Sequence, residues 1–181
     1  MSDLTPARNP GPEMSEQATR STPRTTTFNL LFLCTGNTCR SPLAEGIARQ
    51  AVAARGWRHV RVQSAGVSAA PGGAASPEGV TVAARAGIDL SGHRSQPLTP
   101  GLAEWADLIL AMSPSHLVVV DRVGAGEKAA TLGDFAAGGE GLGHAVPDPY
   151  GGPEELYQQT FDELSALIDQ VLDRLAPILH P

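Results

Sequence analysis

The sequence predicts an α/β protein built in three layers, with a parallel sheet covered by helices on both faces. Short apolar runs of strand length alternate along the chain with longer segments in which apolar residues recur every three or four positions. Gly and Pro residues separate most of these segments, as turns and helix ends require. Because parallel strands need long crossover connections, this alternation indicates a parallel sheet, with its ligand site at the carboxyl ends of the strands.

The first unit of the pattern is a strand, a loop and a helix. An apolar run from Phe28 to Leu33 predicts the strand. The helix covers Pro42 to about Arg55 and stops at Gly56, since Pro favours the first turn of a helix and Gly the position after the last. The apolar residues of this helix form one stripe with a period of about 3.6 residues. They are Leu43, Ala44, Ile47, Ala48, Ala51 and Val52.

The middle of the chain continues the alternation. Val60 to Ala65 alternates apolar and polar residues like a strand and runs into a loop rich in Gly and Pro. The elements expected next are a helix over 77–86 that stops at Gly87, a short helix from Thr99-Pro100, a strand over 106–112, a helix from Ser113-Pro114 to about Val123, and a strand over 128–132. The run Val118-Val119-Val120 is also compatible with a strand, because β-branched residues favour strands.

The last part of the chain contains a long loop and a long helix. Residues 133–152 are rich in Gly and are predicted to form a loop too long for a simple connection, so we expect a functional role. Residues 153–176 form the predicted C-terminal helix, which Pro177 ends. Its core-facing residues step by four and three positions. They are Tyr157, Phe161, Leu164, Ile168, Val171 and Leu175.

Length and composition indicate a single folded domain. The chain has 181 residues, of which 41% are hydrophobic. Residues 1–27 hold almost no large apolar side chains and are predicted to be a disordered tail, because they cannot bury enough surface to order themselves. The folded domain is therefore expected over residues 28–181.

Charge and cysteine content limit the partners and the compartment. The net charge of −6 argues against general affinity for nucleic acid or for an anionic membrane, both of which require a basic face. The chain has two cysteines, no signal-type apolar segment near its start and no apolar stretch long enough to span a bilayer. These features favour a reducing compartment, and we expect a cytoplasmic monomer.

The loop after the first strand is predicted to bind an anion the size of phosphate. It runs from Cys34 to Arg40, and Gly36 and Asn37 can adopt the positive φ that lets successive backbone N–H groups point at one centre. The dipole of the following helix adds positive charge there, and the Arg40 guanidinium can grip two phosphate oxygens. These groups favour the thiolate of Cys34, which is therefore predicted to be a nucleophile aimed at phosphorus. The loop residues expected to bind the phosphate are Thr35, Gly36, Asn37, Thr38, Cys39 and Ser41.

Three other interpretations of this loop fit the sequence less well. Metal binding needs at least two further ligands at workable spacing, and the sequence offers no second Cys pair or nearby His pair. Two structural thiols, Cys34 and Cys39, would not explain why Arg40 and a Ser-Pro helix start follow at this spacing. A Walker nucleotide loop would end in Gly-Lys followed by Ser or Thr, and that ending is missing.

The predicted chemistry also needs a carboxylic acid, because a displaced phosphate ester leaves poorly unless a proton is supplied. Asp148 is the candidate, since it lies in the long loop between Pro147 and Pro149. Alone, this stretch would indicate a helix-entry turn before Pro153. Together with the cysteine loop, it predicts an acid that then acts as base for the water that hydrolyses phosphocysteine.

These two motifs together resemble the low-molecular-weight protein phosphatases. The segments Cys34 to Pro42 and Asp148 to Gly152 carry the resemblance, which runs from about Leu30 to Leu175. It also includes Ser64-Ala65-Gly66, the strand over 106–112 and Gln158-Gln159-Thr160. The resemblance implies a four-stranded parallel sheet with flanking helices, a protein phosphatase activity without metal or organic cofactor, and phosphorylated proteins as partners.

The resemblance also implies roles for individual residues. Cys34 would be the nucleophile, Arg40 the clamp for the phosphate and the transition state, and Asp148 the acid and then the base. A hydrogen-bond network would hold the loop, with the Ser41 hydroxyl near the Cys34 sulfur. The members of this network would be Asn37, Ser41, Ser64 and His93. Cys39 resembles the family's second loop cysteine, which can pair with Cys34 under oxidation, but it also fits a small buried hydrophobic residue.

Two substrates are compatible with the sequence, phosphotyrosine and phosphoarginine. Tyr150 is expected to form a wall of the entrance, where an aromatic substrate side chain could stack. Thr38 indicates phosphoarginine, because family members that hydrolyse it resemble this chain in having Thr there, and a hydroxyl can hydrogen-bond a guanidinium. Two alternatives come from other classes. A catalytically silent phosphate- or phosphopeptide-binding module would be expected to lack Cys34, Arg40 or Asp148, and a thiol-dependent arsenate reductase would need a third cysteine.

Overall fold

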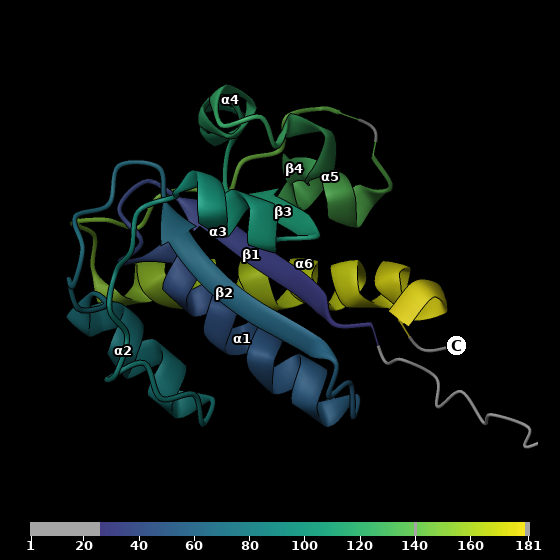
Figure 1. Cartoon of the computed structure of the whole chain (residues 1–181). Helices are drawn as coiled ribbons and strands as arrows, with labels where there is room; N and C mark the ends of the chain where they lie inside the picture. The colour runs from purple at the N-terminus through teal and green to yellow at the C-terminus, as the bar shows by residue number, and fades with distance from the viewer. Residues whose placement is uncertain (1–25, 140, 180–181) are drawn as a thin grey trace, which may run out of the picture.

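The computed structural model describes residues 26–139 and 141–179. Within these ranges, four parallel strands form one sheet in the order β2-β1-β3-β4 (Figure 1). The strands are β1 at Phe28–Cys34, β2 at Val60–Gly66, β3 at Leu108–Ala111 and β4 at Ala129–Thr131, and a 3-10 turn at Gly126–Lys128 precedes β4. Because β1 lies between β2 and β3, it is an interior strand, and its carboxyl end with Cys34 is flanked by a strand on each side. The predicted parallel α/β sheet is confirmed.

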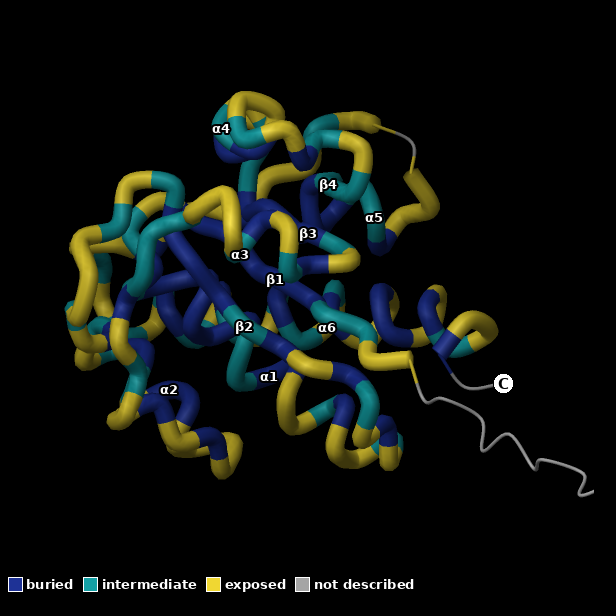
Figure 2. The backbone as a smooth tube through the Cα atoms, viewed as in Figure 1, coloured by how far each residue is buried: buried dark blue, intermediate teal, exposed yellow. Residues whose placement is uncertain are grey.

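Helices cover both faces of the sheet. One face carries α1 at Arg40–Ala54, α2 at Pro77–Arg85, α5 at Leu132–Ala137 and α6 at Glu154–Leu179, and the other carries α3 at Pro100–Trp105 and α4 at Pro114–Arg122. The residues of β1 divide between the two apolar clusters. Leu30 and Phe32 pack with α1 and α6, whereas Leu31 and Leu33 pack with α3 and α4. Figure 2 shows the strands mostly buried in the interior and the outer sides of the helices exposed.

The first strand and helix form as their sequences predict. Residues Leu31 to Cys34 of β1 are fully or almost fully buried, and the predicted apolar stripe turns α1 toward the sheet. Gly56 follows α1 with a positive φ of 71°, a conformation that ends the helix at little steric cost for glycine. The Val118-Val119-Val120 run is helical in α4, where Pro114 opens the helix and Val120 is buried while Val118 is exposed.

The prediction that Pro177 ends the C-terminal helix is wrong. Helix α6 continues to Leu179 with Pro177 inside it. A proline removes one backbone hydrogen bond, and near a helix end little of the ladder depends on that bond. Leu179 is buried against the main apolar cluster, which favours continuing the helix by this final half-turn.

The prediction of one continuous loop over residues 133–152 is wrong at its start. Helix α5 occupies Leu132–Ala137, and the Thr131 side chain caps it by accepting a hydrogen bond from Asp134 N at 3.2 Å. Gly138, with φ 108°, ends this helix. The Gly residues of the segment favoured the prediction of a loop, but its first part belongs to a six-residue helix. The irregular stretch that leads to Asp148 begins only after this helix.

The predicted N-terminal tail lies outside the described residues, apart from Thr26 and Thr27. In the part of the chain that the structure describes, no helix combines the length and the apolarity needed to cross a bilayer.

Candidate active site

The loop between β1 and α1 is the centre of the candidate site. It leaves the sheet at Cys34 and enters α1 at Arg40, and no side chain caps that end of the helix. The first backbone N–H groups of α1 are therefore available to a bound anion. Asn37 adopts a positive φ of 54°. Gly66, at the end of β2, lies close beneath the loop: a Cβ atom there would be 2.5 Å from the Thr35 carbonyl oxygen and 2.9 Å from Asn37 N.

Cys34 lies at the floor of the loop and is 2% exposed. Its Sγ is 2.9 Å from Ser41 Oγ. The same Ser41 oxygen accepts a hydrogen bond from Asn37 Nδ2 at 2.9 Å. One lone pair of Ser41 is thus engaged, and its proton can point to the Cys34 sulfur or to the Ala65 carbonyl oxygen at 3.3 Å. A hydroxyl proton directed at the sulfur stabilises a thiolate.

Asn37 is fully buried and joins the loop to neighbouring segments. Its Nδ2 donates to Ser64 Oγ on β2 at 2.9 Å, and its Oδ1 accepts from Gln96 N at 2.9 Å. Its carbonyl oxygen is 2.7 Å from His93 Nε2. Ser64 donates in turn to Glu45 Oε2 at 2.5 Å. Asn37 therefore ties the curled loop to Ser41 of α1, to Ser64 of β2 and to the segment that contains His93 and Gln96.

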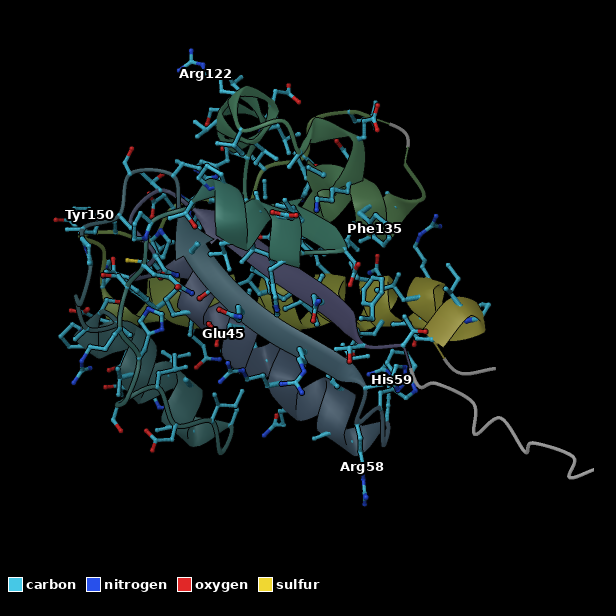
Figure 3. All side chains as sticks on the ribbon, in the orientation of Figure 1. Glu45, Arg58, His59, Arg122, Phe135 and Tyr150 are labelled. Atoms are coloured by element: carbon cyan, nitrogen blue, oxygen red, sulfur yellow. The ribbon has the colours of Figure 1, made fainter. Side chains whose placement is uncertain are left out.

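Two members of this network, Glu45 and Gln96, are not among the residues that sequence reasoning selected. Glu45 lies on α1 one turn after Ser41, so the helical spacing places both side chains on one face of the helix. This spacing could have identified Glu45 from the sequence. Figure 3 shows Glu45 on the β2 side of α1. Gln96 contributes a backbone N–H, for which the residue type gives no signal.

Arg40 and Asp148 form an ion pair at the mouth of the loop. Arg40 Nη2 donates to Asp148 Oδ2 at 3.1 Å, and Nη1 donates to the Val146 carbonyl oxygen at 3.0 Å. The Arg40 side chain is buried, and its Nε has no hydrogen-bond partner among the described residues. Asp148 is about half exposed, and its other oxygen accepts from Tyr150 N at 3.2 Å. A buried orphan donor next to the anion loop is suited to bind a phosphate oxygen.

These groups surround a cavity of about 220 Å³. Its lining residues are Cys34, Thr35, Gly36, Thr38, Cys39, Arg40, Asp148 and Tyr150. Tyr150 is 79% exposed and stands at the rim, at the outer end of the molecule in Figure 3. The predicted nucleophile, clamp and acid are thus brought together with five further residues of the predicted site.

The other predicted residues do not line this cavity. Asn37, within the loop, and Ser41, in the first turn of α1, are both buried. Ser64 and His93 border a separate hollow of about 610 Å³. Contact with substrate is therefore open to the residues of the small cavity, whereas these four side chains act on the loop itself.

Two further buried side chains near the cavity were not predicted as site residues, because each occurs within a predicted helix far from the loop in the sequence. His116 on α4 is 4% exposed, with Nε2 3.0 Å from Thr35 Oγ1 and Nδ1 3.3 Å from Ser113 Oγ. Burial and the nearby charge of Arg40 lower the pKa of His116 to about 4. Tyr157 on α6 places Oη 3.3 Å from Cys39 Sγ, and burial raises the pKa of Tyr157 to about 12.

A thiol, an anion-binding loop, a guanidinium with an unused donor and an accessible carboxyl meet around this cavity at the carboxyl end of β1. This combination on a small parallel α/β sheet is typical of a class of phosphatases. The sequence matches the family described as low molecular weight phosphotyrosine protein phosphatase over residues 29–177, and the chain belongs to this family. It is therefore a protein phosphatase.

Individual relatives bear the names of two kinds of phosphatase. A protein-arginine-phosphatase of Bacillus subtilis (strain 168) is 42% identical over 82% of this chain and 97% of the relative. A protein-arginine-phosphatase of Geobacillus stearothermophilus is 39% identical over 82% of this chain and 96% of the relative. The crystal structure of a low molecular weight protein tyrosine phosphatase from T. tengcongensis is 43% identical, with a TM-score of 0.76 over 82% of this chain and 100% of the relative.

Proposed function

We propose that this protein removes the phosphoryl group of phosphoarginine in other proteins through a covalent intermediate on Cys34. The observation that carries the proposal is the single cavity shared by Cys34, Arg40, Asp148 and the Thr38 side chain. The first three supply a nucleophile, a phosphate clamp and an acid, and Thr38 supplies a hydroxyl that can bind a guanidinium. Phosphorylated proteins are the proposed partners.

In the first step, the Cys34 thiolate attacks phosphorus. A sulfur–phosphorus bond forms, the phosphorus–nitrogen bond of phosphoarginine breaks, and the Asp148 carboxylic acid protonates the departing nitrogen. The loop N–H groups and Arg40 Nε donate hydrogen bonds to the phosphoryl oxygens, whose charge they stabilise in the transition state.

In the second step, water releases the phosphate. Asp148, now a carboxylate, takes a proton from the water that attacks phosphorus. The new phosphorus–oxygen bond replaces the sulfur–phosphorus bond, inorganic phosphate leaves, and the Cys34 thiolate is restored. The Ser41 hydroxyl, 2.9 Å from the sulfur, stabilises that thiolate as leaving group, and Asn37 holds Ser41 in place.

Phosphoarginine is favoured by two observations. Thr38 is one of the residues that line the cavity, and it carries a hydroxyl where an apolar side chain would suit a flat aromatic ring better. In addition, two relatives at 42% and 39% identity are protein-arginine phosphatases. Phosphotyrosine is the second candidate, favoured by the exposed Tyr150 ring at the rim, which could stack on a tyrosine substrate.

Initial rates with matched phosphoarginine and phosphotyrosine peptides test this proposal, with wild type beside Thr38→Ile. We expect wild type to prefer phosphoarginine and Thr38→Ile to reverse the preference, because the substitution replaces a hydroxyl by an alkyl group. A wild-type preference for phosphotyrosine that Thr38→Ile leaves unchanged would instead support the second candidate, with Tyr150 as the better guide to the substrate.

A further inference from the structure

We propose that His116 is a positioning residue that turns the Thr35 hydroxyl so that its oxygen accepts a hydrogen bond from the guanidinium of phosphoarginine. The proposal rests on the function proposed above and adds a second selective hydroxyl to the cavity. It rests on one contact, between His116, a buried residue of α4, and Thr35, an exposed residue of the phosphate loop.

His116 is held rigidly. It is 4% exposed, and both of its ring nitrogens have a hydroxyl partner, Thr35 Oγ1 at 3.0 Å and Ser113 Oγ at 3.3 Å. Ser113 Oγ is itself 2.8 Å from Ser115 Oγ. A buried ring with two satisfied nitrogens has one orientation, so Thr35 is presented with a fixed partner rather than with mobile water.

His116 is uncharged at neutral pH. Burial is the main cause that lowers its pKa to about 4, the charge of Arg40 adds to this effect, and Asp148 opposes it. A neutral imidazole has one N–H donor and one acceptor nitrogen. In the arrangement that we infer, Nδ1–H donates to Ser113 Oγ and Nε2 accepts the Thr35 proton. Thr35 then has only acceptor lone pairs left for the cavity.

An acceptor at this place distinguishes the two candidate substrates. A guanidinium group carries N–H donors and no acceptor, whereas the phenyl ring of phosphotyrosine carries neither. Thr35 and Thr38 both line the cavity that contains Cys34. A phosphoarginine side chain can therefore form a hydrogen bond to Thr35 that phosphotyrosine cannot form. This hydrogen bond strengthens the binding of the substrate and should lower its KM.

The experiment compares His116→Leu, Thr35→Val and the double variant, with kcat and KM measured on matched phosphoarginine and phosphotyrosine peptides and on a small aryl phosphate. We expect each single variant to lower kcat/KM for phosphoarginine by about tenfold, the effect of one hydrogen bond to a charged group. The loss should lie mainly in KM, and the losses for the other two substrates should be much smaller. The double variant should be no worse than either single variant, since both act through one hydroxyl.

Two matched variants separate this role from a structural one. Thr35→Ser keeps the hydroxyl and should retain the wild-type ratio of kcat/KM for the two peptides. His59→Leu makes the same change at a histidine that Figure 3 shows at the opposite end of the molecule from Tyr150, and it should not alter the ratio. Nitrogen chemical shifts of His116 should identify Nδ1 as the protonated nitrogen. If His116→Leu does not fold, the exposed Thr35→Val still tests the hydroxyl.

Four results would overturn the inference. Equal losses on all three substrates would make His116 a purely structural residue, and additive losses in the double variant would uncouple it from Thr35. A wild type that cleaves the aryl phosphate and phosphotyrosine but not phosphoarginine would refute the inference and leave a phosphatase. A wild type that releases phosphate from none of them would refute the proposed mechanism as well.

Discussion

At the scale of single residues, the proposed mechanism separates binding from chemistry at Cys34. Replacing its sulfur by oxygen in Cys34→Ser should abolish turnover, because an alcohol in this cavity is a far weaker nucleophile than a thiolate. The loop N–H groups and Arg40 are untouched, so inorganic phosphate should still bind. Initial rates and a phosphate titration measure the two properties. Substantial remaining turnover would exclude Cys34 as the nucleophile.

The role of Asp148 depends on the leaving group. Asp148→Asn removes the proton donor, so we expect a loss of about a hundredfold or more with a poor leaving group, the typical contribution of general acid catalysis. An activated aryl phosphate needs little protonation and should lose much less in the first step. Burst kinetics on both substrates make this comparison. Equal losses in the first step would assign the acid to another group.

The residues of the site differ in how readily a sequence reveals them. Cys34 and Arg40 bracket one short loop, so their spacing was enough to select them. Asp148, between two prolines, was selected only together with that loop, because its own context also fits a helix-entry turn. His116 and Tyr157 reach the same cavity region from α4 and α6, more than 70 residues further along the chain. Only the tertiary packing of these helices brings their side chains to the loop, and a local sequence pattern does not predict such packing.

At the scale of elements, the close approach of β2 to the phosphate loop gives a prediction at Gly66. A Cβ atom there would lie 2.5 Å from the Thr35 carbonyl oxygen and 2.9 Å from Asn37 N. Because both contacts are backbone atoms, Gly66→Ala must displace the loop. We expect the free energy of unfolding to fall by roughly 1–3 kcal/mol, as for other overpacked sites, with a loss of kcat. Chemical denaturation and initial rates measure both.

Gly101→Ala is the matched control for Gly66→Ala. Gly101 lies in α3, and a Cβ atom there would meet nothing within 4 Å. Alanine also has the higher helix propensity, so this variant should be as stable as wild type or slightly more stable. If Gly66→Ala behaved like the control, the loop would not depend on its contact with β2.

The elements themselves were predictable wherever local signals agree. Strand β1, helix α1 and the Gly56 stop combine apolar pattern and turn chemistry, and the structure follows them. Helix α5 was missed because Gly133 and the Gly residues after it outweighed the Thr131 cap. The helix end predicted at Pro177 was wrong because the free-energy cost of a proline depends on its position in the helix. The burial of Leu179 depends on tertiary packing, which a local sequence pattern does not show.

At the scale of the whole molecule, the buried His116 links stability to pH. Its pKa is about 4 in the folded protein and 6.5 as an unperturbed side chain. Between these values the unfolded chain binds a proton that the folded protein does not, so the free energy of unfolding falls as the pH decreases through this window. Above pH 6.5 both states are uncharged at this residue and the effect vanishes. The pKa values of Asp89 and Asp134 are lowered from 3.8, so the stability that these two carboxylates contribute is present throughout this window and is lost only at lower pH.

His116→Gln removes this titration while keeping a polar side chain that can reach Thr35. Between pH 7 and pH 5, we expect wild type to lose roughly 2 kcal/mol more free energy of unfolding than the variant, as follows from a shift of this size. Urea unfolding at a series of pH values measures the difference, in which contributions from the other titrating groups cancel. His59→Gln serves as control and should follow wild type. Parallel curves for wild type and His116→Gln would mean that His116 accepts a proton in the folded protein, and the neutral ring that orients Thr35 would then be lost in mild acid.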